Sequence, residues 1–255
     1  MKKINFVQKS KAMEMPVKIN PDGLIKSFVE IRYSSKMPFE LAIGAFFNKF
    51  DDSYYYAGAK KQNDLLLNQN ENGQFEIANQ ETYLFFNERI KIECLKDRFI
   101  FDMNDINKER NYIGWNDYFI EIKKALEVFF TAGAISHFKR IGIRYIGQYE
   151  GLNIKEVSRI HLNSDLNEGI ITNNNLTFEG IYLDNRFKIR LGTNYIPDQE
   201  TKFSNIDIDV INEKINLSDL GELYSEINKL HEIEKQIFFK EILSDEYLAK
   251  IETQY

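Results

Sequence analysis

The sequence predicts an α+β fold in which one large, mainly antiparallel sheet packs against two long helices. Two observations lead to this prediction. Runs of alternating apolar and polar residues recur along the chain, as half-buried strands require, and short turn motifs join several of them. Two longer stretches place apolar residues at intervals of three and four, which is typical of amphipathic helices.

The first half of the chain contains a strand, a short helix, a hairpin and a long helix. Its first strand alternates, with Val29 and Ile31 on one face and Glu30 and Arg32 on the other. The elements expected in this half are a strand at Leu24–Tyr33, a helix from Pro38 to Asp51–Asp52, a polar loop at 59–80, a hairpin of Thr82–Cys94 and Phe99–Met103 around Lys96–Asp97, and a helix at Trp115–Ala132.

The second half repeats a similar order of strand, loop, hairpin and helix. Asp184–Asn185 suits a tight turn, because both residue types tolerate a positive φ. The elements expected in this half are a strand at Arg140–Tyr149, a loop at Asn163–Asn175, a hairpin of Leu176–Leu183 and Phe187–Leu191, a half-exposed strand at Asn205–Val210, a helix from the N-cap Ser218 to Leu243, and a final short helix capped by Ser244.

The domain division expected from this order is an N-terminal tail at 1–23, a first half at 24–134 and a second half at 135–255. One continuous domain is the open alternative. Two short matches suggest that the halves arose by internal duplication. Ile31-Arg32-Tyr33 recurs as Ile143-Arg144-Tyr145, and the turn sequence at 95–99 resembles the one at 183–187. Duplication predicts that the two Arg-bearing strands lie close together in one sheet.

Charge and cysteine content restrict the class of protein. The net charge of −6 argues against a protein built mainly to bind nucleic acid and leaves a local basic face open. The single cysteine, Cys94, cannot form an intramolecular disulfide and lies in an apolar alternating run, so a buried side chain is expected. No apolar run approaches the ~18 residues that span a bilayer. The basic N-terminus lacks the hydrophobic run of a signal peptide, so the cytoplasm is the expected compartment.

The candidate site is the polar face of the two Arg-bearing strands. Period-two geometry places Glu30 and Arg32 on one face of the first strand, and Arg140 and Arg144 on the equivalent face of the second. An arginine in a central strand must be paired or solvated, because burial of a bare charge is prohibitive. A structural ion-pair network is favoured, and a site for a carboxylate or phosphate is the alternative.

Other chemistry has little support in the sequence, so no catalytic residue, metal ligand or cofactor is predicted. The histidines His137, His161 and His231 have no second ligand at metal spacing, and a packed or surface position is expected for His231. Asp207 and Asp209 share a strand face and could hold Mg²⁺, although exposed acids of an edge strand are the favoured explanation. Tyr54-Tyr55-Tyr56 is interpreted as strand and core material or as a partner contact.

Several segments also resemble a known class of protein. They are Phe28–Tyr33, the hairpin at Arg98-Phe99, the Trp115 helix, Arg140–Tyr145 and the C-terminal helix that ends in Phe238–Phe239. Together they resemble a sporadically distributed, uncharacterised prokaryotic conserved-hypothetical family. The resemblance implies a cytosolic prokaryotic protein in an accessory system such as phage defence or toxin–antitoxin. It brings no catalytic residues to this chain.

The expected function is therefore a non-enzymatic binding or regulatory module with a protein partner. The alternative is an enzyme or sensor that acts on an anionic small molecule or nucleotide through Glu30, Arg32, Arg140 and Arg144. A binding module predicts a large exposed apolar patch, whereas a sensor predicts a pocket with converging arginines.

Overall fold

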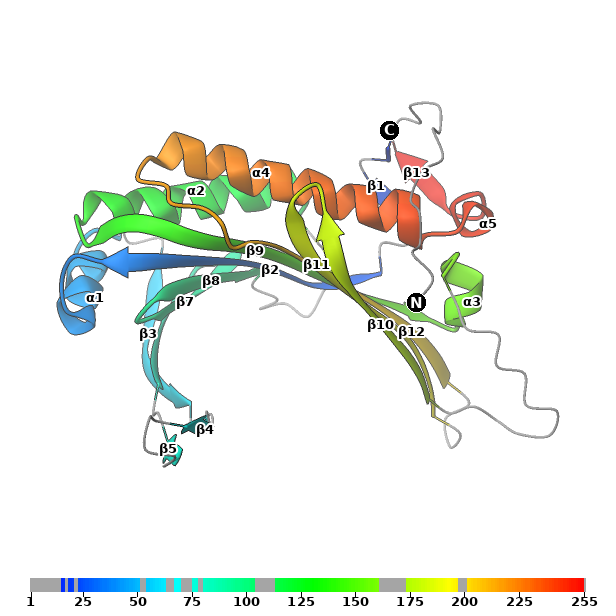
Figure 1. Ribbon diagram of the computed structural model, residues 1–255, viewed down its shortest axis with the longest axis horizontal. Helices are drawn as coiled ribbons and strands as arrows, with labels where there is room; N and C mark the ends of the chain where they lie inside the picture. The colour runs from blue at the N-terminus through cyan, green and yellow to red at the C-terminus, as the bar shows by residue number, and fades with distance from the viewer. Residues whose placement is uncertain are drawn as a thin grey trace.

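The computed structural model contains a nine-stranded antiparallel sheet with its helices on one face (Figure 1). It describes residues 15–16, 18–20, 23–50, 54–62, 67–69, 75–77, 80–103, 113–160, 173–196 and 201–254. The predicted α+β class and large antiparallel sheet are confirmed. Among the described residues, no helix combines the length and the apolar character needed to cross a membrane.

Strands from both halves of the chain form the main sheet. From one edge to the other they are β10 (Asn173–Tyr182), β11 (Asn185–Ile196), β12 (Thr201–Asn212), β9 (Ile135–Glu150), β2 (Leu24–Ser35), β8 (Arg98–Met103), β7 (Ile90–Leu95), β6 (Gln80–Phe86) and β3 (Tyr55–Gln62). Two small antiparallel pairs accompany it, β1 (Lys18–Asn20) with β13 (Glu252–Gln254) and β4 (Leu67–Gln69) with β5 (Phe75–Ile77).

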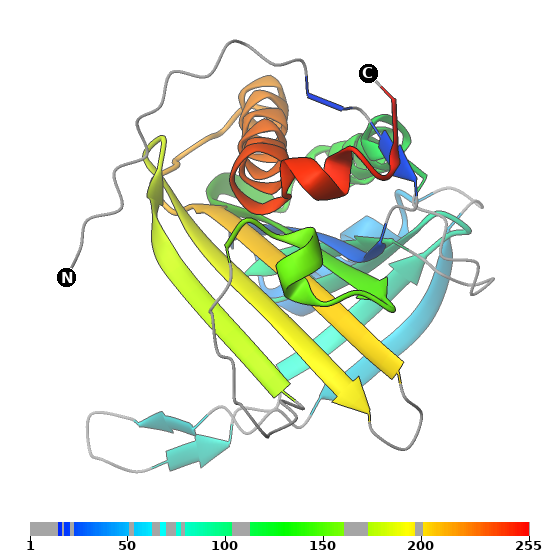
Figure 2. The same cartoon turned by 90° about the vertical axis from the view of Figure 1, so that its right-hand side faces the viewer.

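Two 17-residue helices cover one face of the sheet (Figure 1, Figure 2). The helices are α1 (Phe39–Phe47), α2 (Trp115–Thr131), α3 (Ile154–Val157), α4 (Leu220–Gln236) and α5 (Asp245–Leu248), with a π-helical turn at Ile237–Ile242 after α4. Alternate strand residues such as Val29, Ile31 and Ile143 point toward the helices and are fully buried with Phe129 of α2. The opposite face, here called the open face, is not covered by α2 or α4, and the sheet curves away from these helices at both ends (Figure 1).

The antiparallel pair β2–β9 is the seam between the two halves of the sheet. Its register pairs Val29 with Ile143, Glu30 with Gly142 and Ile31 with Ile141. A local twofold axis through the Glu30–Gly142 pair therefore relates Ile31-Arg32-Tyr33 to Ile143-Arg144-Tyr145. The turn match does not follow this axis, because 95–99 joins β7 to β8 whereas 183–187 joins β10 to β11. Internal duplication stays a prediction.

The expected single strand at Thr82–Cys94 is wrong, because the chain turns at Asn87. The side-chain Oδ1 of Asn87 accepts hydrogen bonds from the backbone N–H groups of Arg89, at 2.8 Å, and Ile90, at 2.9 Å. This local turn separates β6 from β7. The polar loop expected at 59–80 is also wrong in part, since the end of β3 joins the main sheet and β4 pairs with β5 within that range.

Several element boundaries differ from the sequence prediction. The cap of α4 is Asp219 rather than Ser218, because the Asp219 carboxylate accepts the backbone N–H of Glu222 at 3.0 Å. Helix α1 ends at Phe47, and Asp51–Asp52 lie outside the described residues. In the β10–β11 turn, positive φ angles occur at Leu183 and Asp184 rather than at Asn185. Helix α4 ends at Gln236, where the π-helical turn begins. Strand β10 begins at Asn173, inside the expected loop, and 161–172 are outside the described residues.

Candidate functional site

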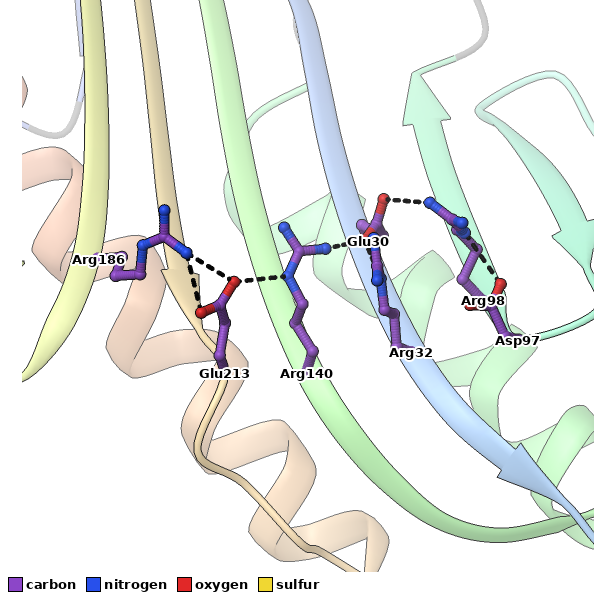
Figure 3. A network of polar contacts seen from close by, with 7 residues as sticks. All are labelled: Glu30, Arg32, Asp97, Arg98, Arg140, Arg186 and Glu213. Atoms are coloured by element: carbon purple, nitrogen blue, oxygen red, sulfur yellow. Dashed lines mark hydrogen bonds and ion pairs between the residues drawn. The ribbon is translucent and has the colours of Figure 1, made fainter. Parts of the chain in front are cut away.

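Charged side chains on the open face form two ion-pair clusters. The first centres on Glu30 of β2, which three arginines approach from three strands (Figure 3). Arg32 donates from Nε to Glu30 Oε1 at 3.0 Å, and Arg140 of β9 donates from Nη1 to the same oxygen. Arg98 of β8 lies 3.6 Å from Glu30 Oε2. One carboxylate therefore holds three guanidinium groups in fixed positions, here called the Glu30 cluster.

Two further carboxylates extend the Glu30 cluster sideways. Asp97 accepts from Arg98 Nε at 3.0 Å on one side. On the other side, Glu213 accepts from Nη1 of Arg186 at 3.0 and 3.1 Å and lies 3.9 Å from Nε of Arg140 (Figure 3). The cluster thus runs across the sheet from the β7–β8 turn to β11.

The second cluster centres on Asp207 of β12, which is only 8% exposed. Arg144 donates to both of its carboxylate oxygens, each at 2.8 Å, and Arg190 of β11 donates to Oδ2 at 2.7 Å. The hydrogen bonds to Asp207 raise the pKa of Arg144 and so favour its charged form. Burial raises the pKa of neighbouring Asp209, an effect that Arg144 and Arg140 partly offset. These four side chains form the Asp207 cluster.

The structure divides the four site residues predicted from the sequence. Glu30, Arg32 and Arg140 meet in the Glu30 cluster, whereas Arg144 belongs to the Asp207 cluster. The interpretation of Asp207 as an exposed acid of an edge strand is wrong, because β12 lies between β11 and β9 and Asp207 is buried.

Sequence reasoning missed the partners that other strands supply to these clusters. Arg186 and Arg190 are four positions apart in β11, so period two places both on one face, and this spacing could have revealed them. Glu213 follows the end of β12, where no periodicity predicts its direction.

A pocket of about 360 Å³ opens beside the Glu30 cluster. Its lining residues are Arg32, Tyr33, Asp97, Lys139, Arg140 and Glu213. Tyr33 and Asp97 are also linked through the backbone, since the N–H of Tyr33 donates to the carbonyl of Asp97 at 2.9 Å. The pocket therefore lies where the β7–β8 turn meets the seam between β2 and β9, and two of the predicted site residues line it.

The side chains of His231 and Cys94 are packed away from the open face. In the part of the chain that the structure describes, no group of histidine, cysteine and acidic residues could hold a metal ion. His231 stacks on Trp115, with ring centroids 4.0 Å apart, and a hydrogen bond of 3.2 Å joins its Nδ1 to the hydroxyl of Tyr145. Burial lowers the pKa of His231 to about 3, and burial raises the pKa of the fully buried Cys94 thiol. The expected packed histidine and buried cysteine agree with this arrangement, and His161 lies outside the described residues.

The fold and site define an α+β protein with one helix-covered sheet face and one charged, open face. No protein-family model matches the chain, and no curated protein matches it. Family membership therefore stays a prediction that rests on the sequence resemblance.

Proposed function

We propose that this protein is a non-enzymatic binding module that holds a partner protein at the free edge of strand β3. Large exposed side chains flank this strand on both faces. Tyr55 is 63% exposed and lies beside Phe86, with ring centroids 5.7 Å apart. Tyr56 points to the other face, where its ring is 5.4 Å from that of Phe47 on α1. We call Leu41, Phe47, Tyr55 and Tyr56 the β3 edge surface; all four are exposed.

An edge strand with exposed aromatic residues invites strand addition. Among the described residues, β6 is the one strand that pairs with β3, so the backbone groups on the outer side of β3 can accept an extended segment. Alternate side chains of such a segment would contact Tyr55 on one face and Phe47 and Tyr56 on the other. Scattered exposed hydrophobic residues need no explanation, but exposed aromatic residues on both faces of an edge strand are the side chains that an added strand would contact.

Helix α1 adds room for a close contact. Gly44 lies between Leu41 and Phe47 on the exposed side of this helix, and a Cβ atom built at Gly44 meets no other atom within 4 Å. A glycine inside an exposed helix costs roughly 0.5–1 kcal/mol relative to alanine. The absence of a side chain at Gly44 would let the backbone of a partner approach the helix closely, and that contact would offset this cost.

The proposed partner is a second protein of an accessory prokaryotic system such as phage defence or toxin–antitoxin, and the proposed compartment is the cytoplasm. The resemblance to the sporadically distributed family supports this setting. The chemistry of the β3 edge surface supports a partner that contributes an extended, apolar segment.

Native mass spectrometry of the protein co-expressed with its neighbouring genes tests the proposal. We expect a complex with a second protein that Phe47→Asp abolishes, because the carboxylate would be desolvated in the interface. The matched control is Ile181→Asp on β10, at the opposite sheet edge, where Ile181 is 73% exposed. Ile181→Asp should leave the complex intact, and hydrogen exchange should show new protection of the β3 amides.

Four results would contradict this function, and three of them concern the complex itself. They are a monomer in every co-expression, a complex of two copies of this chain alone, and a heteromeric complex that survives Phe47→Asp. Equal loss with Ile181→Asp would also contradict it, since that result places the interface elsewhere.

A further inference from the structure

A β-bulge in the seam gathers three cationic side chains at the pocket. Arg32 pairs with Arg140, but the next pair is Tyr33 with Phe138, so Lys139 has no partner in β2. Phe138 and Ile141 are both fully buried under the helices. The two residues between them, Lys139 and Arg140, therefore both face the open side, which is how a bulge redirects a side chain.

Donor groups in this pocket remain available for a ligand. Within the described ranges, Lys139 has no hydrogen bond or ion pair, and its side chain is exposed. Arg32 uses Nε for Glu30, and Arg140 uses Nη1 for the same oxygen. Both Nη atoms of Arg32 and Nη2 of Arg140 donate to no described residue. Glu30 thus acts as a positioning residue that fixes two guanidinium planes and leaves their outer N–H groups unused.

The charge around the pocket is opposite to that of the whole protein. Five cationic side chains meet three carboxylates in the Glu30 cluster and the pocket, an excess of two positive charges, whereas the chain has a net charge of −6. The cations are Arg32, Arg98, Lys139, Arg140 and Arg186, and the carboxylates are Glu30, Asp97 and Glu213. Carboxylates already hold four of these cations, and the ion-pair network still leaves a positive excess on the same residues.

A dianion matches both the charge excess and the free donors. A phosphate monoester carries roughly −1.5 to −2 charges at neutral pH and accepts hydrogen bonds from guanidinium forks. The pocket volume of about 360 Å³ is within the range of roughly 300–1,000 Å³ that small-molecule sites occupy, so it has room for more than a phosphate group. We propose that this pocket binds a small phosphate monoester through Arg32, Lys139 and Arg140. This inference goes beyond the proposed function, because the pocket and the β3 edge surface are separate sites with separate variants.

Isothermal titration calorimetry with ribose 5-phosphate, ribose and inorganic phosphate tests this site. We expect ribose 5-phosphate to bind, ribose not to bind, and inorganic phosphate to bind at least about tenfold more weakly than the ester. Lys139→Ala should lower the affinity for ribose 5-phosphate about tenfold or more. Lys139 is exposed, so this variant should fold normally.

Lys188→Ala is the matched control, because Lys188 lies on the open face of β11, outside the pocket, and pairs with Glu179. Its affinity for ribose 5-phosphate should equal that of the unchanged protein. No binding of ribose 5-phosphate at about 10 mM, or equal losses in Lys139→Ala and Lys188→Ala, would overturn the site. Inorganic phosphate bound as tightly as the ester would overturn the assignment to a monoester.

Discussion

Replacing Arg144 with alanine removes two side-chain hydrogen bonds between β9 and Asp207 of β12. Both are 2.8 Å long and join opposite charges. Asp207 keeps its bond from Arg190, so the buried carboxylate is not left alone. The substitution therefore removes only the free energy that the Arg144 contacts contribute to folding. It does not add the larger cost of an unpaired buried charge.

The expected loss in the free energy of unfolding depends on how exposed the side chains of Arg144 and Asp207 are. Hydrogen bonds to charged groups contribute roughly 1.5–3 kcal/mol each when buried, and exposed ion pairs roughly 0–1 kcal/mol. The Arg144 side chain is 40% exposed and that of Asp207 12%. We therefore expect Arg144→Ala to lower the free energy of unfolding by about 2 kcal/mol. For a chain of this size, that loss corresponds to a fall in Tm of roughly 4–8 °C.

Urea denaturation of Arg144→Ala, compared with Arg186→Ala, is the assay. Arg186 is 60% exposed and pairs with a Glu213 side chain that is 43% exposed, so solvent screens this pair and Arg186→Ala should destabilise the protein much less than Arg144→Ala. Equal effects of the two substitutions would refute the reasoning from burial. Calorimetry should show that Arg144→Ala retains ribose 5-phosphate binding. Unchanged stability with lost binding would make Arg144 a ligand residue.

Three further predictions concern buried side chains. Burial raises the pKa of Glu234 to about 8, so the folded protein retains a proton that the unfolded chain loses above 4.5, and the stability contributed by Glu234 falls as pH rises toward 8. The net fall in the free energy of unfolding should appear between about 6.5 and 8, where His231 is neutral in both states. Glu234→Gln should remove that fall in urea titrations, and an unchanged slope would contradict the shift. Burial lowers the pKa of His231 to about 3, so between about 3 and 6.5 the unfolded chain alone binds a proton, and the stability contributed by His231 falls as pH falls through this range. Above about 4.5 the opposite contribution of Glu234 offsets it, so the net decrease in stability should appear as pH falls from about 4.5 toward 3. His231→Phe should flatten that decrease, and a profile equal to that of the unchanged protein would refute it. Cys94 is fully buried, so a thiol reagent should label it only as fast as the protein unfolds, and rapid labelling of the native state would contradict its position.

Periodicity predicted which face each charged residue occupies, but it could not predict register. The alternation around Glu30 and around Arg144 placed the strand faces correctly, because one face of this sheet is buried. Whether Arg140 or Arg144 lies opposite Arg32 depends on how two strands about 110 residues apart align. Local sequence carries no information on that alignment, so the division into two clusters became visible only in three dimensions.

One local feature was present in the sequence and was overlooked. Lys139 and Arg140 are consecutive charged residues between Phe138 and Ile141, which breaks the period of two inside a strand. Such a break is typical of a bulge. Recognising it would have added Lys139 to the candidate site.

Strand β3 was missed for a different reason. Its sequence ends in Lys60-Lys61-Gln62, and edge strands tolerate charged and polar residues that central strands do not. Polar composition alone therefore does not distinguish an edge strand from a loop. The interpretation of Tyr55 and Tyr56 as strand residues is confirmed by their place in β3, whereas their interpretation as core residues is wrong because both are exposed.

The seam between β2 and β9 has a consequence for synthesis on the ribosome. Strands β8, β7, β6 and β3 extend from β2 on one side of the seam, and all of them are made before β9. While the nascent chain lacks β9, the central strand β2 is the margin of a partial sheet, and the backbone groups that later pair with β9 are unsatisfied. Until β9 is made, these groups of β2 are the part of the partial sheet that a chaperone can protect from pairing with another chain.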